Sequence, residues 1–532
     1  MRPRIAIIGG GPTALFALQA LISSDNPLSI EIFEQFGQIG PGMPYREGLN
    51  DPRMLANIAS REMPPLRMPF AEWLREQDET FLSRFGIARD AIDEAAYYPR
   101  LALGAYFTAQ LAEIVARGRA LGHQIELSPH TRVTDVVPGD AGSAVRWQRK
   151  GRGGASVHDH VLIATGHDWD DPESAASGLL SPWPASRLRM LANRRIGIVG
   201  SSLSAIDVAV AIAAASGTFD TIDGRTIWSP GEHAGTFSVT MMSRNGMLPE
   251  ADAYYPLPFD PLPSLTKERA LEEGQSGQAG LLDRLFALLV DDLARLDPTY
   301  ARAIDLKTRT VETYAAAHFA ERLAVDPFVW AKRNLAEAER LNRQRRVTPW
   351  RYAILRAHEV FECVTAELSA ADLARFHQHL KSVFTDNYAS VPHRSIRRLL
   401  ALHDAGRLEV ERVEGEVGHL GQGAHFDAIV DARGQKPRKL AEIGLPTIAR
   451  TARWSKRSGN DRFRLGFAQP MAGTIQCIAI PYLLRRYPFM QGLVNAHELG
   501  ETAARCILAQ AAARPARPSQ VPEPPRGLAM AG

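Results

Sequence analysis

Two short apolar runs, far apart in the chain, share one hydrophobic pattern. Residues 4–8 read RIAII and residues 195–199 read RIGIV, and only the first position of each is charged. Uninterrupted runs of this length are typical of parallel strands that are buried on both faces. Each run leads into a turn of small residues and then into apolar residues at helical spacing. We therefore expect two units that each consist of a buried strand, a tight turn and a helix.

The turn of the first unit has the spacing of a dinucleotide-binding loop. Gly9, Gly11 and Ala14 form the pattern G-x-G-x-x-A. The first glycine permits the turn, the second lets the backbone approach a pyrophosphate, and the alanine allows close packing of helix on strand. The next apolar run, 29–33, ends at Glu34, where an acid can accept hydrogen bonds from an adenosine ribose. The alternative is a glycine-rich turn without a ligand.

The second unit departs from that pattern at one position. Gly200 and Ala205 stand where the first glycine and the closing small residue belong, but Ser202 replaces the middle glycine. This turn therefore predicts a second dinucleotide, with a degenerate half that only supports the fold as the alternative.

A cation follows the next strand of the second unit. The apolar run 238–242 leads into Ser243 and Arg244. An arginine here suits the 2′-phosphate of NADP better than an acid would. Residues 216–236 must form an excursion between helix and strand, and Arg225 becomes the candidate if that excursion displaces the strand assignment.

The composition of the chain excludes several classes of partner and site but does not indicate a substrate. The chain has 532 residues, 45% of them hydrophobic, and a formal net charge of +3. Such a chain can bury a sizeable core, and its charge balance favours neither nucleic acid nor an anionic membrane as a partner. Its three cysteines lie far apart, which argues against a disulfide framework, an iron–sulfur cluster or a CxxC redox pair. We expect a cytoplasmic protein with a small-molecule partner and no metal, and a homo-oligomer remains open.

Several further segments resemble the flavoproteins that contain two dinucleotide-binding domains. Residues 161–166 (VLIATG) look like the segment where such chains leave the FAD domain, and 428–434 (AIVDARG) look like the return from the NAD(P) domain. The segments that resemble a bacterial FAD/NAD(P)-binding protein family are 40–45 (GPGMPY), 55–58 (LANI), 70–74 (FAEWL), 98–106 (YPRLALGAY) and 492–500 (GLVNAHELG). The class B-like flavin monooxygenases, including N-hydroxylases of amino acids, are related to this family.

The resemblance implies an α/β fold with two Rossmann-like dinucleotide-binding domains, in which an NAD(P) domain splits the FAD domain. Residues 264–385 lie outside the resemblance, and their Ala, Leu, Glu and Arg content at helical spacing predicts a helical insertion. The insertion is either a lid over the flavin or an oligomerisation or packing domain. The predicted ranges are the FAD-binding domain, first part, at 1–170; the NAD(P)-binding domain, first part, at 186–262; the helical insertion at 264–385; the NAD(P)-binding return at 390–438; the FAD-binding domain, last part, at 439–510; and a disordered tail at 511–532.

The resemblance also implies FAD and NADPH as cofactors. The first functional interpretation is a monooxygenase that forms a flavin C4a-hydroperoxide with O₂ and hydroxylates a small polar substrate, such as the amine of an amino acid. A second is an NAD(P)H-dependent flavin reductase that passes electrons to a quinone or a protein. A third is a non-enzymatic FAD-binding redox sensor. No protein side chain has to act as nucleophile, so no catalytic residue is predicted.

The predicted cofactor-binding residues combine the two turns with the positions that the resemblance adds. Among the latter, Arg100 is expected near the flavin, where a cation stabilises the reduced ring, or else as a surface arginine that pairs with an acid. The full set is Gly9, Gly11, Ala14, Glu34, Tyr45, Asn57, Arg100, Val133, Thr165, Gly166, Gly200, Ser202, Ala205, Ser243, Arg244, Gly434, Gly492 and Asn495.

Two polar groups outside this set have alternative interpretations. Tyr388, His393 and Arg394 could bind a substrate carboxylate, although a connecting segment is the simpler interpretation. His158 and His160 alternate in an expected strand and are predicted to face solvent or a turn.

Overall fold

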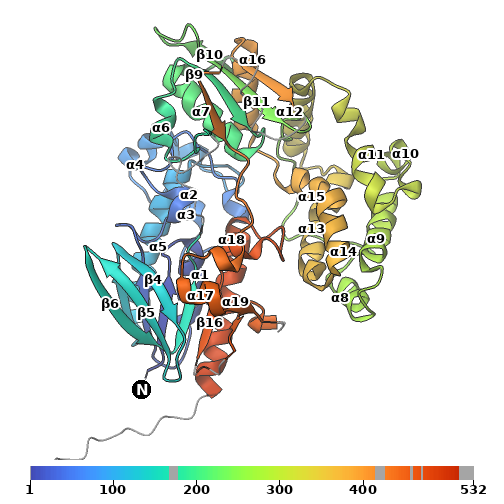
Figure 1. Cartoon of the computed structure of the whole chain (residues 1–532). Helices are drawn as coiled ribbons and strands as arrows, with labels where there is room; N and C mark the ends of the chain where they lie inside the picture. Colours follow the sequence, from blue (N-terminus) through green and yellow to red (C-terminus); the bar gives the residue numbers. More distant parts are fainter. Residues whose placement is uncertain are drawn as a thin grey trace, which may run out of the picture.

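Two parallel sheets and a helical unit make up the structure, a computed structural model (Figure 1). It describes residues 2–166, 178–413, 426–455, 459–468, 471 and 473–513. The second sheet lies above the first in Figure 1, and the helical unit, coloured yellow to orange, lies beside both.

The first sheet has five parallel strands in the order β16-β7-β1-β2-β3. In the central strand β1, Ile7 lies opposite Ile32 of β2 and Leu162 of β7. Both faces of β1 are buried, which explains its uninterrupted apolar run. The strands are β1 (Arg4–Ile8), β2 (Ser29–Phe33), β3 (Gln124–Ser128), β7 (His160–Ile163) and β16 (Thr474–Cys477).

Helices from distant parts of the chain pack on this sheet. Helix α1 (Pro12–Leu21) follows the first turn and contacts α19 (Gly492–Ala513) along much of its length. A Cβ atom at Gly500 of α19 would lie 2.6 Å from the backbone nitrogen of Ala17, so only a glycine allows this approach. Strand β16 and helix α19 therefore return the chain to the domain in which it began.

The second sheet has four parallel strands in the order β12-β11-β8-β13. In β8, Ile198 lies opposite Met241 of β11 and Val430 of β13. The strands are β8 (Arg195–Val199), β11 (Ser238–Ser243), β12 (Leu408–Arg412) and β13 (Ala428–Asp431), and the helices that join them are α7 (Leu203–Ser216) and α16 (His393–Asp404).

The predicted excursion at 216–236 contains an antiparallel hairpin. Strand β9 (Gly217–Ile222) follows α7 directly and pairs with β10 (Arg225–Pro230). The hairpin packs on α16 and α7, and Arg225 is exposed at the start of β10.

Between β11 and α16 the chain forms the helical unit, which has its own apolar core. Fully buried side chains such as Leu285, Tyr314, Phe361 and Phe376 pack there. Its helices are α8 (Lys267–Gln275), α9 (Leu281–Leu296), α10 (Pro298–Ala303), α11 (Val311–Leu323), α12 (Pro327–Gln344), α13 (Pro349–Val364), α14 (Ala370–Arg375) and α15 (Lys381–Tyr388).

Shorter elements complete the two sheet domains. A three-stranded antiparallel sheet packs beside the first sheet, and its strands are β4 (Thr131–Val137), β5 (Ser143–Arg149) and β6 (Arg152–His158). The remaining elements are α2 (Gly42–Tyr45), α3 (Phe70–Arg75), α4 (Glu79–Arg84), α5 (Arg100–Ala120), α6 (Ala185–Arg189), α17 (Pro446–Thr451), β14 (Arg453–Trp454), β15 (Leu465–Gly466) and α18 (Ile480–Leu483).

This architecture confirms the predicted fold class, in which a second dinucleotide-binding domain and a helical insertion interrupt the first domain. The residue boundaries of the domains remain predictions. Most of the expected tail, 514–532, lies outside the described residues. In the part of the chain that is described, no helix is both long and apolar enough to cross a membrane.

Candidate functional site

The first turn brings three backbone segments into very close approach. Gly9 has a φ of +102°, and a Cβ atom there would lie 2.3 Å from the carbonyl oxygen of Ala164, at the end of the neighbouring strand β7. A Cβ atom on Gly11 would lie 3.3 Å from the Cα of Gly42. This bare backbone at the start of α1 is the cradle that a pyrophosphate needs.

Glu34 ties this turn to the end of β2. Its carboxylate accepts hydrogen bonds from the backbone N–H groups of Gly10, at 2.9 Å, and Phe36, at 3.0 Å. Two oxygens offer about four acceptor sites, so capacity for a ribose hydroxyl remains. The predicted ribose contact is therefore compatible with the structure, and the carboxylate also orders the turn itself.

Arg46 is a buried cation at the same place that the sequence did not reveal. Only 8% of it is exposed, its guanidinium stacks 3.9 Å from the Phe36 ring centroid, and its Nη2 lies 3.5 Å from Glu34. Its Nε and Nη1 have no hydrogen-bond partner among the described residues. Buried donors without partners are costly, so they indicate a polar ligand beside the first turn. The first turn, Glu34 and Arg46 together fit FAD.

The second turn repeats the backbone geometry of the first. Gly200 has a φ of +116°, and a Cβ atom there would lie 2.9 Å from the carbonyl oxygen of Ala432, at the end of β13. Ser202 is the N-cap of α7, but its side chain makes no capping hydrogen bond. The Oγ of Ser201 lies 3.0 Å from the Oγ of Ser243, which links the turn to the end of β11.

Comparison with known proteins gives the family. Over 522 residues the chain is 36% identical to the Escherichia coli (strain K12) protein named "Uncharacterized protein YdhS", and the match covers 95% of this chain and 97% of that protein. The chain belongs to the YdhS family. Residues 6–168 match the family described as FAD-NAD(P)-binding, and residues 267–388 match the YdhS-like middle domain. The predicted family and the cofactors FAD and NAD(P) are thereby confirmed.

Solved structures with a similar fold include two ornithine hydroxylases and a lysine monooxygenase. The reduced form of ornithine hydroxylase (PvdA) from Pseudomonas aeruginosa is 14% identical with a TM-score of 0.49, and the match covers 96% of this chain and 100% of that one. The Kutzneria sp. 744 ornithine N-hydroxylase KtzI has the same identity and coverage with a TM-score of 0.46. L-lysine 6-monooxygenase from Pseudomonas syringae is 13% identical over 95% of this chain and 99% of its own, with a TM-score of 0.46. Similarity at this level says nothing about the substrate of the YdhS-family chain.

A cavity of about 490 Å³, counted with the solvent space at its mouth, lies where the three parts of the YdhS-family chain meet. We call it the junction cavity. The first domain, the segment after β11, the helical unit and the segment before α16 all contribute to its wall. Its lining residues are Asn57, Glu62, Tyr97, Asp252, Ala253, Tyr254, Tyr255, Thr348, Arg351, Tyr352, Leu355, Asn387, Tyr388 and Ser390.

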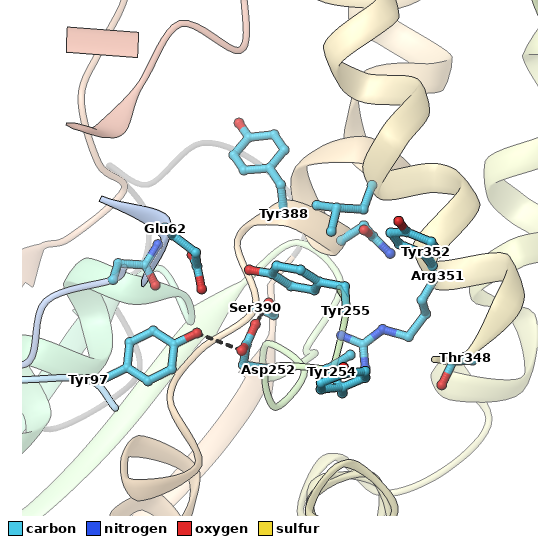
Figure 2. A pocket seen from close by; sticks show the side chains of 14 residues that line it. Glu62, Tyr97, Asp252, Tyr254, Tyr255, Thr348, Arg351, Tyr352, Tyr388 and Ser390 are labelled. Atoms are coloured by element: carbon cyan, nitrogen blue, oxygen red, sulfur yellow. Dashed lines mark hydrogen bonds between the residues drawn. The ribbon is translucent and has the colours of Figure 1, made fainter. Parts of the chain in front are cut away.

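Two carboxylates and two phenols face one another in the junction cavity (Figure 2). Tyr97 donates a hydrogen bond of 2.6 Å to Asp252, and Ser390 donates one of 2.9 Å to the other oxygen of that carboxylate. Burial, reinforced by the charge of Asp252, raises the pKa of Glu62 to about 7. The hydroxyl of Tyr255 points toward Glu62 and opposes this shift. The cavity therefore holds one carboxyl group that titrates near neutral pH.

The helical unit supplies a cation and an amide to the opposite wall. Arg351 of α13 is compensated, because its Nη1 lies 3.2 Å from the Glu250 carboxylate and its Nη2 donates to the carbonyl of Ala251. Asn387 of α15 is only 9% exposed, and it lines the cavity. An amide on the wall of a cavity can donate to and accept from a polar ligand.

Other predicted cofactor residues lie around the first domain. Asn57 lines the junction cavity, and Tyr45 packs against Phe107, with burial raising its pKa to about 12. Gly166 has a φ of +70° just beyond the end of β7, and Val133 lies half-buried in β4. Thr165 is exposed beside Gly166, and Ala14 is buried in α1.

The predicted cofactor-binding residues of the second domain and of α19 differ in burial and in hydrogen bonding. Ala205 is buried in α7, Ser243 ends β11, and Gly434, with a φ of +83°, follows β13. Arg244 is exposed and forms no ion pair with any described residue. At the start of α19, Gly492 has a φ of +84°, and Asn495 donates a hydrogen bond of 3.0 Å to Glu362 of the helical unit.

Arg100 lies in an ion pair between the two dinucleotide-binding domains. Its Nη2 is 2.6 Å from the carboxylate of Asp207 in α7, and its Nε donates to the carbonyl of Leu55. Burial raises the pKa of Asp207 to about 6, although Arg100 opposes the shift. Arg100 thus pairs with an acid at a domain boundary, and its contact with the flavin remains a prediction.

The expectation for His158 and His160 is wrong, because both are buried. Asp159 separates strands β6 and β7, so the two histidines belong to different strands and simple alternation does not relate them. His158 lies edge-on to Phe33, and burial lowers its pKa to about 4. The Nδ1 of His160 lies 2.8 Å from the hydroxyl of Thr474.

The group Tyr388, His393 and Arg394 is divided by the structure. Tyr388 lines the junction cavity, and the Nε2 of His393 lies 2.8 Å from the carbonyl oxygen of Asp252 behind it. Arg394 lines a different cavity. Sequence reasoning missed Glu62 and Asp252, and the only available signal was that Asp252 precedes the pair Tyr254 and Tyr255.

Proposed function

We propose that this protein is an FAD-dependent monooxygenase that consumes NADPH and hydroxylates the amino group of a small substrate held in the junction cavity. The observation that carries the proposal is the position and lining of this cavity. It adjoins Asn57, a predicted FAD contact, and it presents Glu62 and Asp252 among tyrosine side chains. Carboxylates and aromatic faces both attract organic cations.

Two sets of residues would hold the cofactors. The turn at Gly9 and Gly11 would receive the pyrophosphate of FAD, and Glu34 and Arg46 would contact its adenosine part. The turn at Gly200 would receive the pyrophosphate of NADPH, with Arg244 beside the 2′-phosphate. When bound, FAD supplies the hydride acceptor and the activation of O₂.

Side chains in the junction cavity would bind and deprotonate the substrate. An ammonium group has no lone pair with which to attack an oxygen donor, so it must lose a proton first. Asp252, which is fixed by Tyr97 and Ser390, would orient the amine, and Glu62, with a pKa of about 7, would accept the proton. The reaction balances as R–NH₂ + O₂ + NADPH + H⁺ → R–NHOH + NADP⁺ + H₂O.

The helical unit would exclude water from this reaction. Arg351, Tyr352 and Asn387 close one wall of the cavity, so the cavity is complete only when the helical unit is in place. This favours the interpretation of the insertion as a lid. The buried Asn387 amide would bind a second polar group of the substrate.

A coupled assay tests the proposal. The FAD-loaded protein is incubated with NADPH, O₂ and a panel of amines that includes L-ornithine, L-lysine and an unbranched diamine, with the corresponding alcohols as neutral controls. We expect at least one amine to accelerate NADPH oxidation and to gain one oxygen atom by mass spectrometry. Asp252→Asn should abolish the gain, whereas Glu72→Gln, at an exposed position of α3, should retain it.

Three outcomes separate this function from the alternatives. If all consumed O₂ appears as peroxide with every amine, the monooxygenase proposal fails. Fast NADPH oxidation with a quinone and no oxygenated product would support the reductase. Bound FAD that NADPH does not reduce would support the redox sensor.

A further inference from the structure

A second cavity, separate from the junction cavity, is lined by four arginines. It has a volume of about 640 Å³, again counted with the solvent at its mouth. Its wall consists of Pro52, Arg53, Leu55, Arg84, Phe85, Pro99, Arg394 and Arg398. The first six of these residues come from the first domain, and the last two come from α16 of the second domain. No acidic residue is part of this wall. We call it the arginine cavity.

Two of the four arginines have no carboxylate partner within the described residues. Arg53 lies 3.6 Å from Asp51, and Arg84 lies 2.5 Å from Glu47. Arg394 is exposed, and its side chain makes no ion pair or hydrogen bond with the residues that the structure describes. Arg398 is only 6% exposed and donates a hydrogen bond of 2.9 Å to the backbone carbonyl of Arg53. A buried guanidinium without a carboxylate partner is an uncommon and costly arrangement.

The nearest carboxylates are already engaged elsewhere. Asp207 is paired with Arg100 at 2.6 Å, and Asp51 is paired with Arg189 at 3.0 Å. Burial and the positive charges of Arg394 and Arg53 lower the pKa of Arg398 to about 10. The carboxylates Asp51 and Asp207 therefore offset only part of the positive charge around Arg398.

The helix that carries Arg394 and Arg398 adds to this positive potential. Both residues lie in the first two turns of α16, whose first turn contains no acid and whose N-cap, Pro392, offers no side-chain hydrogen bond. Cations are unfavourable at a helix N-terminus, whereas anions are stabilised there. Because α16 precedes β12 in a parallel sheet, its N-terminus lies at the carboxyl edge of that sheet, which is also the edge of the turn at Gly200.

We propose that the arginine cavity binds a phosphate group. Guanidinium groups bind phosphate through paired, charge-assisted hydrogen bonds, and several of them converge here without enough counter-charge. The phosphate could belong to the nicotinamide nucleotide, which binds at the same sheet edge, or to a separate phosphorylated molecule. This inference does not depend on the amine substrate proposed above.

Binding of inorganic pyrophosphate tests the site by calorimetry on the protein as purified, with and without saturating NADP⁺. We expect Arg394→Gln to weaken binding by about tenfold or more, as the loss of one charge-assisted hydrogen bond predicts. The matched control is Arg225→Gln, because Arg225 is exposed in the β9–β10 hairpin and does not line the cavity. It should bind pyrophosphate like the wild type.

NADP⁺ then identifies the source of the phosphate. If pyrophosphate still binds when NADP⁺ is saturating, and Arg394→Gln weakens that binding, the ligand is a separate phosphorylated molecule. If NADP⁺ competes, and Arg394→Gln weakens NADP⁺ as well, the phosphate is that of the nucleotide. Absence of pyrophosphate binding, or equal binding by wild type and Arg394→Gln, overturns the proposal.

A charge reversal provides a second test that does not require a ligand. Arg394→Glu places a carboxylate near Arg398 and at the N-terminus of α16, where the structure favours negative charge. We expect this variant to raise the unfolding temperature above that of the wild type in phosphate-free buffer and to lose pyrophosphate binding. An unfolding temperature below that of the wild type would contradict the positive electrostatic potential assigned to the arginine cavity.

Discussion

The two dinucleotide-binding turns have the same backbone but different surroundings. At Gly9 and at Gly200, a positive φ lets the turn pass within contact distance of a carbonyl at the end of the neighbouring strand, Ala164 in one domain and Ala432 in the other. The first turn continues with Gly11 against the backbone of Gly42. The second continues with Ser202, and its candidate contact for the ribose phosphate, Arg244, is exposed.

This difference indicates two kinds of nucleotide binding. Around the first turn, Glu34 receives two backbone hydrogen bonds, and Arg46 is buried beside it with two donors that bind no described residue. Such a preorganised site is suited to a cofactor that remains bound. An exposed arginine next to an otherwise similar turn is suited to a nucleotide that enters and leaves in each catalytic cycle.

The largest effect is expected at the first turn. Gly11→Val places a branched side chain against Gly42 and in the path of the pyrophosphate, so the affinity for FAD should fall by at least about tenfold, a loss of ~1.4 kcal/mol or more, and the protein should purify with much less FAD than the wild type. The ratio of flavin to protein absorbance measures this. Ser202→Val is the matched control and should retain FAD. A Gly11→Val protein with full flavin content would contradict the assignment of the first turn to FAD.

A smaller effect is expected at Arg244. A charge-assisted hydrogen bond to a 2′-phosphate contributes about 1.5–3 kcal/mol, which corresponds to a preference of roughly ten- to a hundredfold. Arg244→Ala should therefore raise KM for NADPH by that factor and leave KM for NADH almost unchanged. Steady-state kinetics with both nucleotides measure it, and Arg225→Ala should alter neither. Equal losses for both nucleotides would assign Arg244 a structural role.

Substrate binding in the junction cavity, which lies between the two dinucleotide-binding domains, should depend on pH. Because an ionised Glu62 attracts an ammonium group, KM for a cationic substrate should fall severalfold as pH rises through about 7. Glu62→Gln should flatten the profile, and Glu72→Gln should not. A wild-type profile that is flat across this range would exclude Glu62 from substrate binding.

The same group has an opposite effect on stability. The pKa of Glu62 is raised in the folded protein from an ordinary value of 4.5 to about 7, so its favourable contribution is present below 4.5 and is lost as pH rises through about 7. The free energy of unfolding of the wild type should therefore fall relative to that of Glu62→Gln over this interval. Urea denaturation of both proteins at several pH values measures the difference.

The smallest effect is expected at Ser202. Its side chain makes no capping hydrogen bond, so Ser202→Gly should change stability by only a few tenths of a kcal/mol. If the serine impedes approach of the pyrophosphate, KM for NADPH should fall by about twofold or less. A large gain in NADPH affinity would mean that this one side chain accounts for the difference between the turns.

The sequence pattern predicted the strands, turns and helices that depend on neighbouring residues in the chain. The strand at 4–8, the turn at Gly9, the second strand and Glu34 all follow from short-range signals, and so does the corresponding unit that begins at Arg195. The helical unit followed from its periodicity. These features depend on residues that are close together in the chain, where spacing reports geometry directly.

The junction cavity could not be predicted in this way. Glu62, Asp252 and Asn387 are far apart in the chain, and they meet only because the two sheet domains and the helical unit pack against one another. Arg46 was missed for a related reason, because its role depends on burial against Phe36 and not on a motif. His158 was misplaced because a strand break at Asp159 altered which face it occupies.

Anaerobic reduction by nicotinamide nucleotide tests the central claim, that the two turns bind different nucleotides that act on each other. The purified FAD-containing protein is mixed with NADPH without oxygen, and the absorbance of oxidised FAD is followed in a stopped-flow instrument. We expect complete bleaching, faster with NADPH than with NADH, and much slower bleaching with NADPH in Arg244→Ala. Oxidised FAD that neither nucleotide reduces would contradict it.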